Sequence, residues 1–579
     1  MRRTLSLLSV GLLVAACAPA ASQATPAPSL TPVPTATATA VPRLWISDAV
    51  PTPLRAHALS AGIPTAPAPE TATITLDVVS GAEAGASAED PDLPSAVWVY
   101  ALVAPFPTLV DELTLAEVRA AWNGEARDSF AGSPLLMSEA TLAAFRSVWG
   151  EPSTGAIEAL PPDAILDAAW AAMPSWAIVP FEDLEPRWKV LAVDGQSPAR
   201  NDFEAAGYPL SLRFQVSATS TSFAAPLRDG WPATNRDPRK ITTLVLTGVT
   251  ALVRFTAITM NAKGVLYPGR DIRDWLRGAD IAHISNEVPF WGGCQPTREP
   301  GRLIFCSDPS YIQLLEDIGA DVIELSGDHF GDYGPDATTL TIEMYNERGM
   351  GYYGGGLDLE DAAEPLFVEH NGNKLALFGC NAKGRGGALA FATERKPGAY
   401  PCDLPDMATK IREAVSAGYV VVATFQWHES QTYSPVPFVT QISDFQRMAD
   451  AGASIVSGSQ AHSPQTMEFH DRAFIHYGLG NLFFDQMGDL SGQPESVRDE
   501  FLDRYTIYDG RVVSIELLTA KLEDYSRPRP MTADERWEFL ARMFTLSGWT
   551  DQPTRPSPVP TVTLTPIRLP AGAGTPPAP

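Results

Sequence analysis

The sequence predicts an α/β protein in which a larger layered domain follows a smaller one. Short apolar runs bounded by glycine and polar residues recur through residues 241–520, and stretches with helical spacing separate them. Strands that alternate with helices produce this pattern. The 579 residues are 45% hydrophobic and 19% charged, as in globular proteins. A chain of this length has room for two or three domains with buried cores.

The N-terminal residues predict export and attachment to a membrane. Arg2 and Arg3 precede an apolar run at residues 5–14 that is too short to span a bilayer. Val-Ala-Ala-Cys at residues 14–17 resembles a bacterial lipoprotein signal, in which Cys17 is lipidated and becomes the mature N-terminus. The alternative is a simple signal peptide with a chance cysteine. Residues 18–43 are rich in Pro, Thr and Ala, which predicts an extended linker. We therefore expect an extracytoplasmic protein that is lipid-anchored to the cell membrane.

The charge of the chain excludes some partners. The formal net charge is −26 and the sequence pI is about 4.7, so the overall field repels nucleic acid and anionic membrane surfaces. The sequence also contains no basic run that would indicate nucleic-acid binding. A polyanionic substrate would be repelled at long range, so any anion must bind through a local arrangement of side chains.

Beyond Cys17 the chain has an even number of cysteines, which predicts disulfides in an oxidising compartment. Cys294 with Cys306 and Cys380 with Cys402 would close the shortest loops, and we expect these pairs. A zinc site with four thiolates is the alternative, but the spacings contain no CxxC.

The smaller α/β domain is predicted over residues 44–218. Residues 71–78 alternate as a strand does, residues 98–103 form an apolar run, and residues 113–122 have helical spacing with Thr114 as the N-cap. Residues 219–240 are rich in proline and are expected to be a linker.

The larger domain is predicted over residues 241–520, with strands at residues 244–246, 281–284, 322–325, 375–378, 420–425 and 512–517. Apolar positions from Phe438 to Ala449 predict a helix that Gly452 ends. Residues 521–551 are expected to add a C-terminal helix capped by Thr532, and residues 552–579 a disordered tail rich in Pro and Thr.

Polar side chains that can bind metals follow four of these strands. Glu287, Asp328, His428 and His462 come from separate strand ends, and we expect them to meet at one edge of a sheet. Carboxylates and imidazoles that converge in this way can hold a divalent metal ion, which polarises an ester and ionises a water. Taken singly, each residue could instead be a solvated loop charge, a turn cap or a surface ion pair.

The larger domain also resembles a known family. Six motifs occur in order, and together they are similar to the CapA family, which is associated with poly-γ-glutamate capsule synthesis: SNEVP, LSGDHFGDYG, GMGYYGGG, FQWHE, SGSQAHSPQ-x-ME and IHYGLGNLFFD. That family is similar to the calcineurin-like metallophosphoesterases. The resemblance covers about residues 241–520 and implies a β-sandwich flanked by helices, with a site at the strand ends.

The sequence departs from the family pattern at positions that matter for metal binding. Val249 stands where the family has a carboxylate, and Gln426 and Gln460 stand where it has histidines. Asp328 replaces an amide and can still bind a metal ion. We therefore expect at most one divalent ion, Mn, Fe or Zn, and the alternative is that no metal binds. The expected ligands are Glu287, Asp328, His428 and His462, with His329 as acid, base or anion contact and Asn286, Gln426, Gln460 and Asn481 lining the site.

Three stretches of the smaller domain resemble part of a periplasmic solute-binding domain of the phosphate-binding type: LTLAEVRAAWNGE, WAIVPFEDLEPRWKVLAVDG and YPLSLRF. A serine- and glycine-rich anion loop is missing, so the resemblance implies either a binding module or a remnant with a packing role, and we favour the remnant.

Two hypotheses for the whole chain follow. The first is a lipid-anchored CapA-like protein that acts on a capsular polymer or a small anionic ligand, by metal-assisted hydrolysis or transfer. The second is a non-catalytic binding or assembly factor on a metallophosphoesterase scaffold that has lost its metals.

Overall fold

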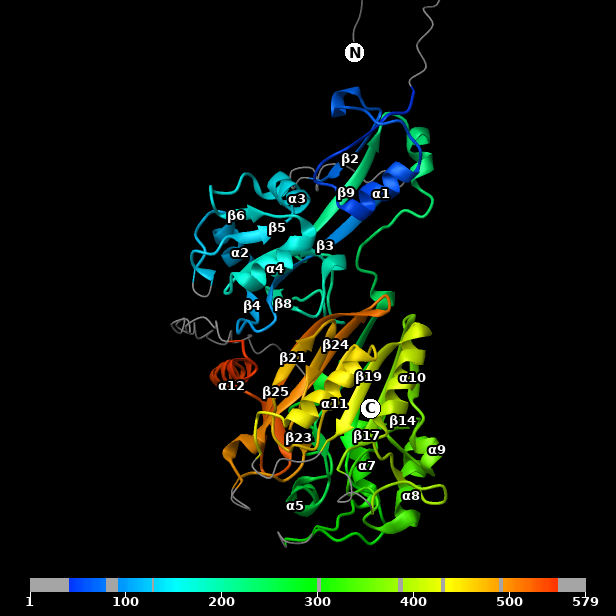
Figure 1. The fold of residues 1–579 in the computed structure, drawn as a ribbon. Coiled ribbons are helices and arrows are strands. Elements are labelled where there is room, and N and C mark those ends of the chain that lie inside the picture. Colours follow the sequence, from blue (N-terminus) through cyan, green and yellow to red (C-terminus); the bar gives the residue numbers. More distant parts are fainter. Residues whose placement is uncertain are drawn as a thin grey trace, which may run out of the picture. The chain divides into compact units, whose positions relative to one another are not determined.

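The computed structural model describes residues 41–79, 92–127, 130–298, 303–383, 389–427, 433–488 and 493–549 (Figure 1). Cys17, all but the end of the predicted linker at 18–43, and the predicted tail at 552–579 lie outside the described residues. Within the described ranges, no helix combines the length and the apolar character needed to cross a membrane.

The first domain is a mixed sheet covered by short helices. Its strand order is β1-β2-β9-β3-β7-β5-β6, and β8 pairs with β3 and β4. The strands are β1 (Leu44–Ile46), β2 (Ile74–Val78), β3 (Ser95–Pro105), β4 (Glu112–Leu113), β5 (Leu135–Met137), β6 (Ile157–Ala159), β7 (Trp176–Pro180), β8 (Trp188–Val193) and β9 (Ser211–Ala218). The helices are α1 (Thr52–Ser60), α2 (Leu115–Trp122), α3 (Glu139–Trp149) and α4 (Ile165–Ala171).

The local predictions for this domain are confirmed except at one end of a strand: the strand expected over residues 71–78 begins at Ile74, after a 3-10 helix at Pro69–Thr71. Ile74, Leu76 and Val78 of β2 are buried, and the residues between them are half-buried, as the alternation predicts. Thr114 caps α2 in a capping box with Glu117, which satisfies N–H groups that the first turn leaves unpaired.

Residues 219–240, expected to be a linker, pack against the first domain. A 3-10 helix at Thr221–Leu227 buries Ala224 and Leu227. The side chain of Asn235 exchanges two hydrogen bonds of 2.8 Å with the backbone of Val99 in β3. Composition predicted a loop here, but the pairing of one amide with a buried strand holds the segment in place.

The second domain contains two sheets. The large sheet has the order β14-β13-β12-β10-β24-β25-β26, with β11 between β12 and β23, and the small sheet has the order β16-β17-β19-β20-β22-β21. The strands of the large sheet are β10 (Ile241–Thr247), β11 (Val249–Thr250), β12 (Ile281–Asn286), β13 (Val322–Glu324), β14 (Gly351–Tyr353), β23 (Asn481–Phe483), β24 (Asp499–Tyr508), β25 (Arg511–Glu523) and β26 (Arg527–Pro530). Those of the small sheet are β16 (Leu366–His370), β17 (Asn373–Asn381), β19 (Val420–Gln426), β20 (Ile455–Gly458), β21 (Met467–His470) and β22 (Ala473–His476), and β15 (Gly355–Gly356) pairs with β18 (Gly398–Ala399).

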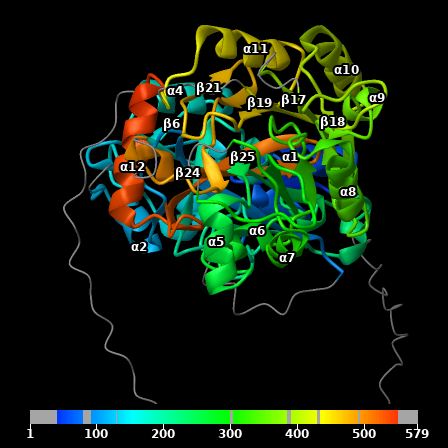
Figure 2. The same ribbon diagram turned by 90° about the horizontal axis from the view of Figure 1, so that it is seen from below.

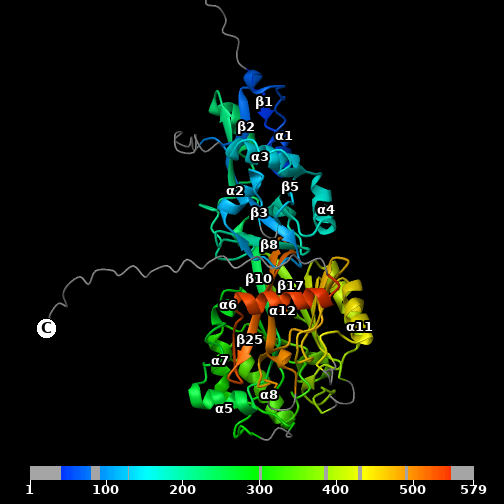
Figure 3. The same ribbon diagram turned by 90° about the vertical axis from the view of Figure 1, so that its left-hand side faces the viewer.

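The helices of this domain are α5 (Arg254–Lys263), α6 (Arg273–Arg277), α7 (Ile312–Asp317), α8 (Gly334–Asn346), α9 (Leu359–Ala362), α10 (Leu404–Ser416), α11 (Val439–Asp450) and α12 (Ala533–Leu546). The predicted strands correspond to β10, β12, β13, β17, β19 and β25, although β13 ends one residue before the predicted Leu325, and the helix predicted from Phe438 is α11. The helix expected within residues 521–551 is α12, capped by Thr532, and it packs over β25 (Figure 3). Residues 521–523 continue β25 instead of beginning that helix.

The two sheets face each other and helices cover their outer sides (Figure 2). Apolar side chains of both sheets form one core between them, including Leu244, Tyr505, Val422 and Phe474. A second core joins the large sheet to α5–α8, and a third joins the small sheet to α10 and α11. This β-sandwich between helical layers is the α/β architecture that the sequence predicts.

The disulfide prediction is also confirmed. Cys294 pairs with Cys306 and Cys380 pairs with Cys402, with Cα–Cα distances of 5.8 Å and 5.0 Å.

Candidate functional site

Two strand ends of the large sheet meet and bring two carboxylates together. Glu287 follows β12, and Asp328 follows β13 after a short loop. A Cβ atom on Gly327 would lie 2.5 Å from both the Cα and the carbonyl oxygen of Glu287, so only glycine permits this contact between the loops. Glu287 is 1% exposed and Asp328 is 8% exposed, so both carboxylates are held out of water.

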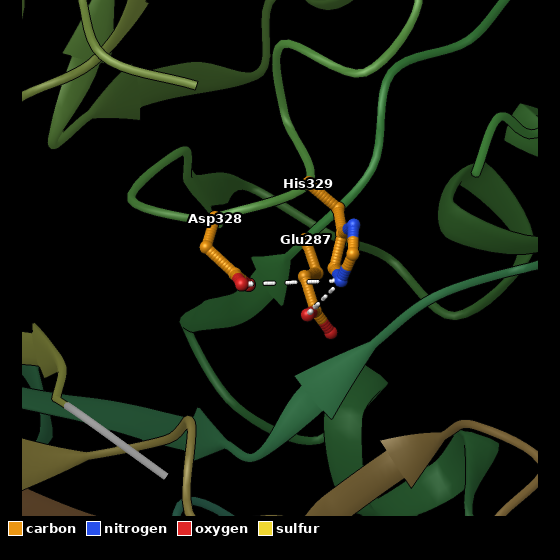
Figure 4. A group of neighbouring side chains, drawn as sticks. All are labelled: Glu287, Asp328 and His329. Atoms are coloured by element: carbon orange, nitrogen blue, oxygen red, sulfur yellow. Dashed lines mark ion pairs between the residues drawn. The ribbon is translucent and has the colours of Figure 1, made fainter. Parts of the chain in front are cut away.

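A histidine completes a group of three possible metal ligands (Figure 4). His329 Nε2 lies 3.9 Å from Glu287 Oε1 and 3.9 Å from Asp328 Oδ2, and the three ligand atoms lie within 4.8 Å of one another. We call Glu287, Asp328 and His329 the carboxylate–histidine group.

Contacts to Nδ1 and to the ring fix the orientation of the His329 side chain. Its Nδ1 lies 2.7 Å from Asp332 Oδ2, and the N–H of Phe305 donates to the same oxygen at 2.7 Å. The Phe305 ring lies 4.5 Å from the imidazole, centre to centre. Because Asp332 holds Nδ1, the other nitrogen, Nε2, faces Glu287 and Asp328. Metal sites in which a carboxylate orients a histidine have the same arrangement.

Lys383 is a member of the site that the strand-end reasoning missed. Its ammonium pairs with Asp328 Oδ2. The Lys383 N–H donates to Asn381 Oδ1 at 2.9 Å, and Asn381 Nδ2 donates to the carbonyl of Ser326 at 2.6 Å. Asn381 ends β17, so this chain of hydrogen bonds joins the small sheet to the loop that carries Asp328. The sequence offered a signal for this residue, because Lys383 lies two residues after the end of the buried strand β17.

Burial and neighbouring charges move the pKa values of the group apart. Burial raises the pKa of Glu287, and the nearby Asp328 carboxylate raises it further. Burial alone would raise the pKa of Asp328 as well, but His329 and Lys383 outweigh it and hold that pKa below its usual range. Burial alone would lower the pKa of His329, but the hydrogen bond with Asp332 and the charges of Glu287 and Asp328 raise it to about 9.

The donor set fits one divalent metal ion. Two carboxylate oxygens and an imidazole nitrogen suit Mn, Fe or Zn. Glu287 Oε2 and Asp328 Oδ1 are buried and have no hydrogen-bond partner within the described part of the chain. Buried polar atoms are nearly always paired. Burial and the Asp328 charge raise the pKa of Glu287 to about 8, so a proton shared by the two carboxylates, or a cation in its place, would pair these oxygens. A metal ion would bind His329 in place of the proton that the raised pKa keeps on its ring.

The structure places three of the other expected residues, His462, Asn481 and Gln460, against one another. His462 Nδ1 lies 2.9 Å from Asn481 Oδ1, and His462 Nε2 lies 3.5 Å from Gln460. His462 therefore does not join the group whose ligand atoms lie within 4.8 Å. Where we expected His462 as a ligand, the described residues bring His329. His428 lies outside the described residues.

The residues that depart from the family pattern have distinct surroundings. Val249 is fully buried in β11, paired with Ser285 and Asn481. Both amide atoms of Gln426 are buried and unpartnered among the described residues. Asn286, which was expected to line the site, uses its amide Nδ2 to donate to the carbonyl of Val288 at 2.7 Å.

Comparison with known proteins shows which family the second domain matches. Residues 243–486 match the family model described as "Bacterial capsule synthesis protein PGA_cap". The chain is 25% identical over 309 residues to the capsule biosynthesis protein CapA of Bacillus anthracis, a match that covers 52% of this chain and 72% of that protein. Residues 243–486 belong to the CapA family.

Another CapA relative, the PGA biosynthesis protein of Bacillus subtilis (strain 168), is 29% identical over 177 residues, which is 30% of this chain and 45% of that protein. The chain thus spans less than half of the B. subtilis CapA. Among solved structures, a 5'-nucleotidase precursor from Thermus thermophilus aligns with a TM-score of 0.31 at 12% identity, over 52% of this chain and 58% of that one. An ABC-type phosphate transport receptor from Vibrio cholerae aligns with a TM-score of 0.27 at 12% identity, over 33% of this chain and 94% of that one.

Proposed function

We propose that this chain is a cell-envelope protein that takes part in the synthesis or handling of a capsular polymer of the poly-γ-glutamate type. Membership of residues 243–486 in the CapA family supports this, as do relatives named for capsule and PGA biosynthesis. We further propose that the carboxylate–histidine group binds one divalent metal ion and that the site hydrolyses or transfers a phosphoester or amide bond. The observation that carries the second proposal is the convergence of two buried carboxylates and an imidazole that Asp332 orients, with ligand atoms within 4.8 Å of one another.

The residues of the site would have distinct roles. Glu287, Asp328 and His329 would hold the ion, which when bound supplies Lewis-acid chemistry and a nucleophilic water. Asp332 fixes the direction of the imidazole. Lys383 provides a local positive charge beside Asp328, in a protein whose net charge of −26 repels polyanions at long range. Lys383 therefore suits contact with an anionic group of the substrate.

A second candidate function is a non-catalytic binding or assembly factor. The ammonium of Lys383 already neutralises Asp328, and Val249, Gln426 and Gln460 occupy positions where the family has metal ligands. A scaffold that lost its metal could keep this arrangement as an anion-binding site.

Metal content distinguishes the two candidates. Purified protein is loaded with Mn, Fe or Zn, dialysed, and measured by elemental analysis. We expect one ion per chain, lost in His329→Ala. His470→Ala is the matched control, because His470 belongs to a group with Asp450 and Asp471 of the same residue types that lies at the surface. Protein that retains no metal under any loading condition, or that loses as much metal in His470→Ala as in His329→Ala, refutes the metal site and leaves the binding factor.

We also propose that the chain is extracytoplasmic and anchored through Cys17. The two disulfides support an oxidising compartment. Cells grown with a radiolabelled fatty acid should label the wild-type protein and not Cys17→Ser. Labelling of both proteins, or of neither, contradicts the anchor.

A further inference from the structure

Gln426 is a buried glutamine whose amide group has no partner. It is 0% exposed, and neither Oε1 nor Nε2 makes a hydrogen bond within the described part of the chain. The other glutamines of that part with a buried unpartnered amide atom lack a partner at the oxygen only. Buried polar groups are nearly always paired, so an amide that lacks both bonds indicates a partner from outside the chain.

The Gln426 side chain faces the large sheet. Two residues earlier in β19, Thr424 Oγ1 donates to Glu324 Oε1 of β13 at 2.9 Å. Phe425, between them, points to the other side of the small sheet and stacks on Phe445 of α11 with 4.5 Å between ring centres. Side chains alternate along a strand, so Gln426 lies on the same side as Thr424, between the two sheets.

The strand end that carries Gln426 lies beside a loop of the carboxylate–histidine group. In the register of β17 and β19, Asn381 is the partner of Gln426. Asn381 Nδ2 donates at 2.6 Å to the carbonyl of Ser326, two residues before Asp328. Gln426 therefore lies at the same end of the sandwich as Asp328.

Gln460 brings a second unpartnered oxygen to this place. The N–H of Ser459 donates to the carbonyl of Phe425 at 3.0 Å, so Gln460 and Gln426 each follow one of two bonded residues. Gln460 is 1% exposed, its Nε2 lies 3.5 Å from His462 Nε2, and its Oε1 is buried without a partner in the described part of the chain. Two acceptor oxygens and one donor nitrogen are thus left open at neighbouring strand ends.

These atoms require a donor and an acceptor from the bound molecule. The oxygens of Gln426 and Gln460 accept hydrogen bonds, and Gln426 Nε2 donates them. An amide carries both an N–H and a carbonyl and can pair with all of them, whereas an ionised phosphoester group carries acceptors only. A buried oxygen left without a donor is costly, so a site built in this way rejects a molecule that lacks the N–H.

We propose that Gln426 and Gln460 bind the amide group of the substrate and make the site selective for amides over phosphoesters. The Gln426 N–H donates to the carbonyl oxygen of the substrate, and the glutamine oxygens accept from its N–H. This inference rests on the proposed function for the place of the site, and it requires no metal ion.

Calorimetric titration of the full chain with three probes tests the selectivity. The first is a trimer of glutamate joined by γ-amide bonds, the second is the same trimer with ester oxygens in place of the amide N–H groups, and the third is diethyl phosphate. We expect the amide trimer to bind, the ester trimer to bind at least about tenfold more weakly because it lacks the N–H, and diethyl phosphate to bind more weakly still. The proposal is overturned if the amide trimer does not bind, or if either of the other probes binds as tightly.

A variant without the amide locates the contact. Gln426→Met keeps the length of the side chain and should weaken binding of the amide trimer at least about tenfold, so that the amide and ester trimers bind alike. Its melting temperature should equal or exceed that of the wild type, because the change removes buried atoms that lack partners. If it melts lower, Gln460→Met, which removes the second unpartnered oxygen, should show the same loss of preference for the amide.

Gln196→Met is the matched control, because Gln196 Oε1 is also buried without a partner in the described part of the chain but belongs to the first domain. If Gln426→Met and Gln460→Met bind the amide trimer as tightly as Gln196→Met does, the two glutamines hold water alone and the proposal is overturned.

The titration and the metal analysis fail separately. Protein that retains no metal and still prefers the amide trimer refutes the metal site and supports this inference. Protein that retains one ion and shows no preference for the amide overturns this inference and leaves the metal site in place.

Discussion

Replacing Gly248 tests how closely the turn between β10 and β11 packs against Gly480. Gly248 lies between β10 and β11, with backbone angles that any residue can adopt. A Cβ atom at this position would lie 2.2 Å from the carbonyl oxygen of Gly480 and 2.7 Å from its carbonyl carbon. Both are backbone atoms, so no side chain can rotate away to make room.

The cost of Gly248→Ala follows from this contact. An ordinary contact to a Cβ atom begins at 3.4 Å, so the two segments must move apart by about 1 Å. Overpacking of this kind costs about 1 to 3 kcal/mol. The movement also weakens the 3.1 Å hydrogen bond from the Val249 N–H to the Gly480 carbonyl, which adds about 1 kcal/mol. We expect a loss of about 3 kcal/mol in the free energy of unfolding.

Urea denaturation followed by circular dichroism measures the loss. Gly292→Ala is the control, because a Cβ atom there meets nothing within 4 Å, and its stability should change by no more than about 0.5 kcal/mol. If Gly248→Ala costs less than about 1 kcal/mol, the contact with Gly480 is not tight in solution and the reasoning fails.

Two further predictions concern buried groups of the second domain. Burial lowers the pKa of His283 to about 3, so the neutral ring contributes stability that is present above the unfolded pKa near 6.5 and is lost as the pH falls toward 3. Between pH 6.5 and about pH 5 the wild type should therefore lose up to about 2 kcal/mol relative to His283→Gln in urea titrations, and parallel curves for the two proteins would contradict this. Replacing Cys380 and Cys402 together by Ala should cost about 3 kcal/mol, because the disulfide closes a loop with a sequence separation of 22. A melting temperature that equals the wild-type value, measured by calorimetry without reductant, would show that this loop does not constrain the unfolded chain.

The sequence predicted much of the fold because local patterns determine individual elements. The runs at residues 281–284 and 420–425 became fully buried strands, and Thr114 and Thr532 cap helices where expected. The pairing of β10 with β24 could not be predicted in this way, since apolar runs carry no information about which distant strand lies beside them. For the same reason, composition missed the packing of residues 219–240.

The candidate site was predictable only in part. Glu287 and Asp328 were found because each follows a strand, but their contact depends on Gly327, whose role emerges only when the two loops meet. His329 was expected as an acid, base or anion contact, and the structure places its ring, which Asp332 orients, beside Glu287 and Asp328. Lys383 also follows a buried strand, but that position alone does not show its pairing with Asp328, which depends on how the two sheets face each other.

The pairing of β10 with β24 constrains when this domain can fold. All seven residues of β10 are buried, and its partner begins at Asp499, near the far end of the domain. Until the ribosome has made that partner, one side of a central apolar strand lacks its hydrogen bonds and can pair with other chains. An exported protein, as proposed above, crosses the membrane unfolded, and a strand that stays unpaired until late in synthesis is compatible with that route.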